Sequence, residues 1–337
     1  MEKKLRIGLI GIGGMGSHHL FTSHAENPRV QIVALCDLIE ERCTNAIKRL
    51  GIDGISVYTD FREMIDKEDL DAVDIATPNN FHSIIAVYAM EHGLHVFCEK
   101  PDAVSVEEAQ KMKEASEKYG KVLMVMRNNR YYENSQYLKK YIESGAAGEI
   151  YCGRCGWIRR RGIPGKGGWV TTKAQSGGGP LIDLGVHMID LSIWLMGNPK
   201  PVAVSGCTYS KFANDDAQSD SEHSKFGDAK EDGTFDVEDL AMGFIRFDNG
   251  ACLQIEFSWA SNIEGETRFV ELRGTKAGIT WCDNGDMDNG HDEALRHFTR
   301  IVLDGAAPDY VPEQGLNMIK ILEAIYKSAE TGREVVL

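Results

Sequence analysis

Short apolar runs alternate with helix-compatible stretches from the start of the chain to Met126. Five runs have the length and composition of buried parallel strands: Leu5–Ile10, Val30–Cys36, Ala72–Ala76, His95–Cys98 and Val122–Met126. Helices are favoured over Ser17–His24, Phe61–Ile65, His82–His92 and Ser105–Tyr119. Strand and helix in this alternation predict an α/β fold with a doubly wound parallel sheet.

The pattern changes beyond residue 126. A helix is expected over Ser135–Ser144, and longer strands with alternating polar and apolar residues follow: Glu149–Arg159, Val202–Ser210, Leu240–Phe247, Ala251–Trp259 and Thr267–Gly274. Asp248-Asn249-Gly250 predicts a hairpin turn between two of them. We therefore expect two domains, residues 1–126 and 127–337. The second is an α+β domain with a large mixed sheet, one face of which is open for a partner subunit.

The first strand leads directly into Gly11-Ile12-Gly13-Gly14-Met15-Gly16, and the second strand ends at Asp37. Strand, glycine turn, helix, strand and acid stand in the order of a dinucleotide-binding Rossmann unit. Gly11 allows the tight turn, Gly13 lets phosphates approach the backbone, and Gly16 lets the helix pack on the sheet. The Asp37 carboxylate can accept hydrogen bonds from the adenosine ribose and would repel a 2′-phosphate. The sequence therefore predicts NAD as cofactor in preference to NADP.

Two further segments stand at the carboxyl ends of predicted strands, where ligands bind to parallel sheets. Thr77-Pro78-Asn79-Asn80 follows Ala72–Ala76, and Glu99-Lys100-Pro101 follows His95–Cys98. A lysine at this edge points toward the nicotinamide end of a bound cofactor. Pro101 fixes the backbone after it and is compatible with a cis bond.

The second domain carries a candidate catalytic helix behind the glycine-rich stretch Ser176–Pro180. Pro180 suits a first helical turn, so Asp183 and His187 would lie one turn apart on one face, with Asp190 beside them. A carboxylate and an imidazole on an otherwise apolar helix are costly unless they are used or satisfied. We therefore expect this pair to be functional, with the glycines permitting close approach of a ligand.

An arginine run and an acidic segment leave two interpretations open. Arg159–Arg161 precede a glycine-rich stretch, and residues 213–239 hold ten acids and two lysines. Most of the acidic segment is expected to be a solvated loop. The arginines could hold an anionic group or pair with the acidic loop, and the sequence favours neither.

Composition narrows the class of protein. The formal charge of −14 argues against a nucleic-acid surface, and no apolar run is long enough to span a membrane. The chain opens with Met-Glu-Lys-Lys and moves into a strand, which is not the pattern of a signal peptide. Its eight cysteines are therefore expected to be reduced thiols in the cytoplasm. Cys152-Gly-Arg-Cys155 has no second metal-binding pair, so no metal is expected.

Taken together, these motifs resemble the glucose–fructose oxidoreductase/inositol dehydrogenase (Gfo/Idh/MocA) family over nearly the whole chain. The matching segments are Gly11–Gly16, Ala76–His82, Glu99–Pro101, Gly177–Asp190 and Glu323–Gly332. The resemblance implies a Rossmann domain and an open-faced sheet domain that builds homodimers or homotetramers. It also implies hydride transfer between NAD and a secondary carbinol of a sugar, inositol or sugar derivative.

The resemblance also implies roles for individual residues. His187 is the acid/base that takes the hydroxyl proton, Lys100 stabilises negative charge on the same oxygen, and Asp183 holds a substrate hydroxyl. The expected cofactor-binding residues are Gly11, Ile12, Gly13, Gly14, Met15, Gly16, Asp37, Thr77, Pro78, Asn79, His82, Glu99 and Lys100. The expected substrate-binding residues are Lys100, Arg127, Arg130, Trp169, Asp183 and His187.

Two alternatives stay open at this level. Some relatives are NAD-dependent glycosidases that oxidise C3 transiently, and others are regulatory proteins that sense NAD or sugars without catalysis. The presence of Lys100 and His187 favours an ordinary dehydrogenase.

Overall fold

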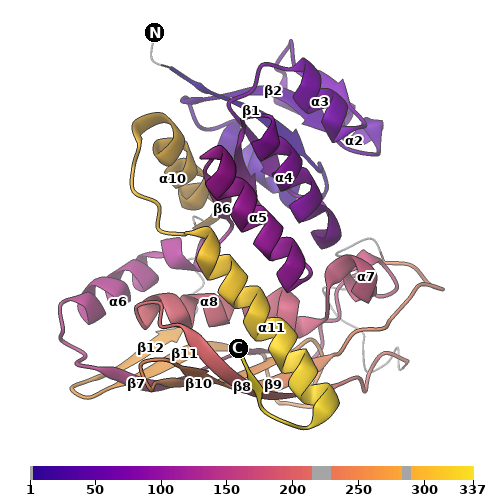
Figure 1. The fold of residues 1–337 in the computed structure, drawn as a ribbon. Coiled ribbons are helices and arrows are strands. Elements are labelled where there is room, and N and C mark those ends of the chain that lie inside the picture. Colours follow the sequence, from indigo (N-terminus) through magenta and orange to yellow (C-terminus); the bar gives the residue numbers. More distant parts are fainter. Residues whose placement is uncertain (1–2, 215–228, 283–289) are drawn as a thin grey trace. The chain divides into compact units, whose positions relative to one another are not determined.

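The computed structural model describes residues 3–214, 229–282 and 290–337 (Figure 1). By internal contacts the chain forms two units. Unit 1 comprises Met1–Ala103, Glu107–Met126 and Gly290–Leu316, and unit 2 comprises Val104–Val106, Arg127–Asn289 and Asn317–Leu337. The second segment of unit 1 ends at Met126, and the division into domains at residues 126 and 127 stays a prediction.

A late segment of the chain, Gly290–Leu316, lies in unit 1 although the sequence pattern placed it in the second domain. Its helix α10 (Gly290–Asp304) buries one face, including Leu295 and Phe298. The Phe298 ring lies 5.4 Å from the ring of Phe97, which belongs to the parallel sheet. This long-range packing decides where the segment belongs, and no local pattern reveals it.

Unit 1 is built on a six-stranded parallel sheet in the order β3-β2-β1-β4-β5-β6. The strands are β1 (Leu5–Ile10), β2 (Val30–Cys36), β3 (Ser56–Tyr58), β4 (Ala72–Ile75), β5 (His95–Cys98) and β6 (Leu123–Val125). This is the doubly wound Rossmann order, and it confirms the predicted fold class. The order reverses between β1 and β4, so the ligand-binding crevice is expected at the carboxyl ends of these two strands.

Helices connect the strands of this sheet. They are α1 (Gly14–His18), η1 (His19–His24), α2 (Glu40–Leu50), α3 (Phe61–Lys67), η2 (Asn79–Phe81), α4 (His82–Glu91) and α5 (Val106–Tyr119). The segment predicted as one helix over Ser17–His24 is α-helical to His18 and continues as a π-helix from His19. The sequence pattern missed α2 and β3. In β3 no residue is buried, so it lacks the apolar signature of a central strand.

Unit 2 contains a seven-stranded sheet in the order β12-β11-β7-β10-β9-β8-β13. Its strands are β7 (Ile150–Ile158), β8 (Pro201–Tyr209), β9 (Leu240–Phe247), β10 (Cys252–Ser258), β11 (Thr267–Gly274), β12 (Gly278–Cys282) and β13 (Val335–Val336). The pair β7/β10 is parallel and the other pairs are antiparallel, which confirms the predicted mixed sheet.

One face of this sheet carries the core of unit 2. Along β10, Leu253, Ile255 and Phe257 are fully buried, whereas the residues between them point to the other face. The helices of the unit are η3 (Asn128–Tyr131), α6 (Glu133–Glu143), η4 (Trp169–Thr171), α7 (Lys173–Ser176), η5 (Leu181–Gly185), α8 (Val186–Leu195) and the greater part of α11 (Pro312–Thr331). Figure 1 shows α6 and α8 together on one side of the strands.

Candidate active site

The glycine turn after β1 has the shape of a phosphate cradle. Gly11 has φ +91°, and a Cβ there would lie 2.6 Å from the Ala76 carbonyl oxygen. A Cβ on Gly16 would lie 1.8 Å from the Gly11 carbonyl oxygen, so α1 can pack this closely only through glycine. A Cβ on Gly13 would meet nothing within 4 Å. The open side of the turn is therefore at Gly13, where no side chain blocks a phosphate.

The carboxylate of Asp37 is fixed beside this turn. Its Oδ2 accepts the Ile12 N–H at 2.8 Å and its Oδ1 accepts the Ile39 N–H at 2.9 Å. The Arg42 guanidinium lies 3.7 Å from Oδ1. An acid held at the end of β2 next to the glycine turn is suitably placed for an adenosine ribose.

The loop after β4 adds an unsatisfied polar atom at the same edge. Within the described part of the chain, the buried Thr77 Oγ1 has no hydrogen-bond partner. Buried hydroxyl groups are normally satisfied, so an orphan atom beside Gly11 fits a polar ligand in this crevice. Pro78 and the buried Asn79 complete the loop, and Asn79 begins η2. The donor set and the glycine cradle together fit NAD.

His82, which the sequence placed among the cofactor-binding residues, is fully buried. Its Nδ1 lies 2.8 Å from the Pro101 carbonyl oxygen and its Nε2 lies 3.0 Å from the Thr77 carbonyl oxygen. Burial lowers the pKa of His82, although both carbonyl groups oppose this. The ring ties the Thr77 loop to the segment after Lys100, whose peptide bond to Pro101 is cis. Direct contact of His82 with the cofactor stays a prediction.

Glu99 supports Lys100 from within unit 1. Its Oε2 accepts the Lys100 N–H at 3.0 Å, and its Oε1 lies 2.9 Å from His19 Nε2. Burial raises the pKa of Glu99, but the hydrogen bond and charge of His19 outweigh it and bring the pKa to about 2. The carboxylate is therefore ionised and holds the main chain at Lys100.

A buried ionic cluster in unit 1 was not found from the sequence. Asp74, in the middle of β4, lies 3.0 Å from His19 Nδ1 and 2.8 Å from His24 Nε2. Burial opposes charge on His19, but the carboxylates of Asp74 and Glu99 raise its pKa to about 10. Burial lowers the pKa of the neighbouring His291 to about 4. The sequence feature that could have revealed the cluster is Asp74 itself, because a charged side chain in an apolar strand requires a partner.

In unit 2, Asp183 and His187 follow the glycine-rich stretch as expected, but the predicted regular helix is wrong in its first part. Leu181–Gly185 is a π-helix, and the α-helix begins at Val186. A π-turn changes the angular spacing, so simple i, i+4 stacking does not describe the pair. Asp183 Oδ2 accepts the Trp259 Nε1–H at 2.9 Å, and the His187 ring lies 6.1 Å from the Trp157 ring.

Asp190, which the sequence placed beside this pair, is buried with two arginines. Its carboxylate accepts Arg127 Nε–H at 2.9 Å and two N–H groups of Arg130, at 2.7 and 2.8 Å. The two arginines are 3% and 1% exposed. Their guanidinium groups are therefore engaged in anchoring α8, and direct contact with a substrate stays a prediction for both.

Trp169 lies in η4 and lines a polar cavity of about 320 Å³ together with Thr172 and Gln175. Contact of Trp169 with a substrate stays a prediction. Asp183 and His187 do not line this cavity.

The arginine run holds a neighbouring loop. Arg160 donates to the Ile263 carbonyl at 3.1 Å, and Arg161 donates to Ser261 and Asn262 at 2.9 and 2.7 Å. Arg159 lies 3.8 Å from Glu266. Residues 215–228 of the acidic segment lie outside the described residues, so an anionic group and the acidic loop both stay predictions as partners of the arginines.

Gly178 and Gly179, which precede the helix of Asp183 and His187, do not leave room for a ligand, and this corrects the expectation from the sequence. A Cβ on Gly178 would lie 2.0 Å from the Tyr326 hydroxyl, and one on Gly179 would lie 2.0 Å from the Glu238 carbonyl oxygen. Protein atoms therefore occupy the space that these glycines leave free.

No group of three or more histidine, cysteine, aspartate or glutamate side chains in the described residues could hold a metal ion. No helix within them is long and apolar enough to cross a membrane.

A glycine turn at the switch point of a doubly wound sheet is typical of dinucleotide-binding folds. The chain belongs to the Gfo/Idh/MocA family. The family model described as "Oxidoreductase family, NAD-binding Rossmann fold" matches residues 5–127, and that of the "GFO/IDH/MocA C-terminal domain" matches residues 135–280.

Full-length relatives are similar to this chain. D-glucoside 3-dehydrogenase of Escherichia coli (strain K12) is 32% identical over 99% of this chain and 97% of its own. Levoglucosan dehydrogenase of Pseudarthrobacter phenanthrenivorans is 31% identical over 99% of this chain and 91% of its own length. A solved structure of levoglucosan dehydrogenase in complex with NADH and levoglucosan has a TM-score of 0.80 and 26% identity, covering 99% of both chains. The protein is thus an NAD-dependent dehydrogenase acting on CH–OH groups.

Proposed function

We propose that the protein transfers hydride between NAD and a secondary carbinol of a pyranose sugar or glycoside. The observation that carries this proposal is the carboxylate of Asp183 and the imidazole of His187 on consecutive helical turns, with the half-buried indole ring of Trp157 lying 6.1 Å from the His187 ring. Indole rings offer apolar faces to the C–H face of a sugar, and a few polar groups then fix its orientation. Relatives that match over nearly the full length are named as dehydrogenases of a glucoside and of levoglucosan.

His187 is proposed as the group that removes the hydroxyl proton during oxidation and returns it during reduction. An imidazole suits both directions, since its unperturbed pKa of about 6.5 lies near neutral pH. Asp183, held by the Trp259 N–H, is proposed to accept a hydrogen bond from a substrate hydroxyl and to orient the sugar. When bound, the nicotinamide supplies the hydride chemistry.

Lys100 is proposed to donate a hydrogen bond to the reacting oxygen. As the carbinol loses its proton, negative charge grows on that oxygen, and an ammonium group stabilises it. What supports this role is its position directly after β5 and the support that Glu99 gives to its main chain.

Cofactor choice and binding are proposed to follow the geometry of unit 1. The pyrophosphate would be held at Gly11–Gly16, the ribose at Asp37, and the neighbouring groups at Thr77–Asn79. The unsatisfied Thr77 hydroxyl and the open side of Gly13 support this arrangement.

The open face of the unit 2 sheet is proposed as the surface through which the protein forms homodimers or homotetramers. Along β8 and β9 this face carries Tyr209, Met242 and Phe244, and Tyr209 is 46% exposed. We also propose the cytoplasm as its location, because none of its eight cysteines forms a disulfide.

The proposed function is tested by following NADH at 340 nm with NAD or NADP and a panel of glucosides, anhydrosugars, aldoses and inositols. The wild type is compared with H187N and K100M, which keep similar side-chain volumes. We expect the wild type to be active with one class of sugar. In both variants this activity should fall by about 100-fold or more. Full activity of H187N would refute the role of His187.

A further inference from the structure

The helix that carries Asp183 and His187 has no capping side chain of its own. It begins after Pro180, whose position provides no side-chain hydrogen bond to the first turn. The N–H groups of Ile182 and Asp183 instead donate to the Gly179 carbonyl at 3.1 and 3.0 Å. The main chain at Asp183 is therefore tied to Gly179, and its position depends on what holds Gly179.

Gly179 is held by a carboxylate from a distant segment. Glu238 Oε2 accepts the Gly179 N–H at 2.9 Å, and its Oε1 accepts the Leu181 N–H at 3.1 Å. Glu238 is 6% exposed, and no basic side chain of the described residues forms an ion pair with it. Its two oxygens thus serve as the missing cap at the start of the helix, where a negative charge also suits the helix dipole.

A tyrosine completes the arrangement. The Tyr326 hydroxyl of α11 donates to Glu238 Oε1 at 3.0 Å. The same hydroxyl fills the space left by the missing side chain of Gly178, where a Cβ would lie only 2.0 Å away. Gly178 and Gly179 are therefore required so that Tyr326 and Glu238 can reach the main chain of the loop.

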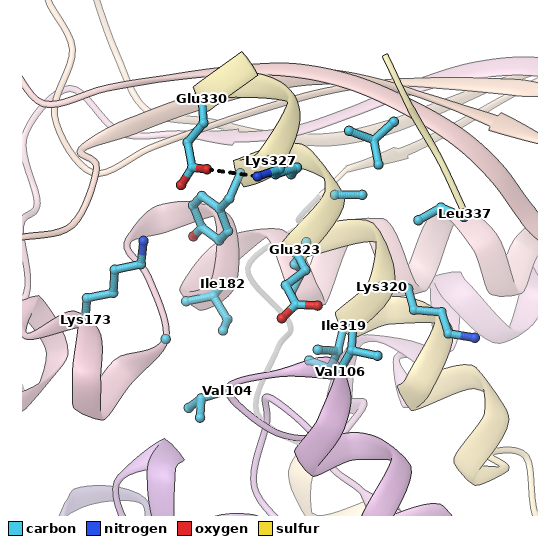
Figure 2. A pocket seen from close by; sticks show the side chains of 15 residues that line it. Val104, Val106, Lys173, Ile182, Ile319, Lys320, Glu323, Lys327, Glu330 and Leu337 are labelled. Atoms are coloured by element: carbon cyan, nitrogen blue, oxygen red, sulfur yellow. Dashed lines mark ion pairs between the residues drawn. The ribbon is translucent and has the colours of Figure 1, made fainter. Parts of the chain in front are cut away.

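The other side of Tyr326 borders a cavity of about 630 Å³ in unit 2. Figure 2 shows this cavity, with Lys173 and Ile182 on one side and Glu323 and Lys320 of α11 on the other. The Lys173 ammonium lies 5.6 Å from the centre of the Tyr326 ring. Tyr326 thus connects the surface of α11 to the loop that starts the catalytic helix.

We propose that Glu238 and Tyr326 are positioning residues that set the place of Asp183 and His187 through the main chain of Gly179 and Leu181. The proposal rests on the proposed function, in which Asp183 and His187 act on the substrate. Neither Glu238 nor Tyr326 is assigned contact with substrate or cofactor.

The chemistry of the cap makes the carboxylate irreplaceable by an amide of the same shape. Two N–H groups approach two different oxygens of Glu238, so both ends of the side chain must accept. Glutamine has one acceptor oxygen, and its NH₂ group would face one of the two N–H donors. E238Q therefore removes one hydrogen bond to the loop and places the NH₂ group of the glutamine next to a backbone N–H, where two donors repel each other.

The neighbouring residue offers a matched control. Asp239 is also buried and also accepts two backbone N–H groups, from Lys211 and Phe212 at 2.5 and 2.6 Å. Both approach the same oxygen, Oδ2, so an asparagine can keep them. Its loop carries neither Asp183 nor His187, which makes D239N a test of general damage to this segment.

The experiment measures kcat, KM for the sugar and the dissociation constant of NADH for wild type, E238Q, Y326F, D239N and H187N. Titration with NADH gives the concentration of folded protein that binds the cofactor, and kcat is expressed per NADH-binding site. We expect E238Q to lower kcat by about 10- to 100-fold, because a displacement of about 1 Å at a reacting group has this effect. Y326F should lower kcat by a smaller factor, of about 3- to 10-fold, since it removes one donor and keeps the cap. NADH binding should change less than twofold in all variants, and D239N should keep the kcat of the wild type.

Two results would overturn the proposal: wild-type kcat in E238Q, or an equal loss of kcat in E238Q and D239N. If E238Q does not yield folded protein, Y326F decides, because it keeps the carboxylate; an unchanged kcat in Y326F then contradicts the proposal. Wild-type activity of H187N would instead refute the proposed function, so the two failures are distinguishable.

Discussion

Replacing Asp74 by asparagine tests the buried ionic cluster of unit 1. Asp74 is 1% exposed, and its oxygens lie 3.0 Å from His19 Nδ1 and 2.8 Å from His24 Nε2. D74N keeps the shape but removes the charge that offsets His19. Removing one partner of a buried ion pair destabilises a protein by about 3–5 kcal/mol, so we expect the free energy of unfolding to fall by this amount near pH 6.

The pH dependence of this stability has a definite sign. The pKa of His19 is raised from 6.5 to about 10, so its contribution is complete below pH 6.5 and is lost between pH 6.5 and 10. The pKa of Glu99 is lowered from 4.5 to about 2, so its contribution is complete above pH 4.5 and is lost as the pH falls from 4.5 to 2. The cluster therefore stabilises unit 1 most between pH 4.5 and 6.5.

In D74N the His19 pKa is raised less, because only Glu99 remains as an acidic partner. The difference in stability between wild type and D74N should therefore shrink by about 1 kcal/mol or more between pH 6 and pH 9. Urea titrations followed by far-ultraviolet circular dichroism at both pH values measure this difference. All five tryptophans lie in unit 2, so tryptophan fluorescence would not report on unit 1 directly.

D304N serves as the control for this prediction. Asp304 forms an exposed ion pair with Arg29, and such pairs contribute about 0–1 kcal/mol. The assignment of a charged His19 is refuted if D74N lowers the free energy of unfolding by no more than D304N does. It is also refuted if the loss of stability caused by D74N grows between pH 6 and pH 9.

Three further predictions concern the cofactor site and α8. D37A should weaken NAD binding more than NADP binding, because the ribose acceptor is lost while Arg42 remains to face a 2′-phosphate; equal loss in fluorescence titrations would contradict the assignment. G16A should abolish NADH binding and lower the melting temperature, since its Cβ would lie 1.8 Å from a backbone oxygen; G13A should leave the melting temperature within about 2 °C of wild type and weaken only NADH binding. D190N leaves two buried arginines without their anion and should lower the free energy of unfolding by about 3–5 kcal/mol in urea titrations; a loss below about 1 kcal/mol would show that the cluster is not needed.

The Rossmann unit was predictable because its signals are local. The glycine turn forces strand, turn and helix within a few residues, and the runs at Leu5–Ile10, Val30–Cys36 and His95–Cys98 match the observed strands. The missing pieces have weak local signals: the three-residue β3 with no buried residue, and α10, which joins unit 1 only through packing such as Phe97 on Phe298.

The helical segment that carries the candidate residues was predictable from the sequence, but the contacts that support it were not. The sequence places Asp183 and His187 on one helix, and the structure retains that placement. The π-turn at Leu181–Gly185 and the cap from Glu238, 59 residues from Gly179, depend on tertiary contacts. The glycines before the helix were interpreted as space for a ligand, because a missing side chain does not indicate which atoms fill its place.

The central claim is net oxidation of a sugar carbinol by NAD, and the stoichiometry of the reaction tests it most directly. A sugar that gives activity is incubated with excess NAD, and NADH formed is counted against keto-sugar formed and against glycoside cleaved. The account predicts one NADH per keto-sugar, with no glycosidic bond broken. Cleavage of the glycoside without accumulation of NADH would contradict it and indicate an NAD-dependent glycosidase.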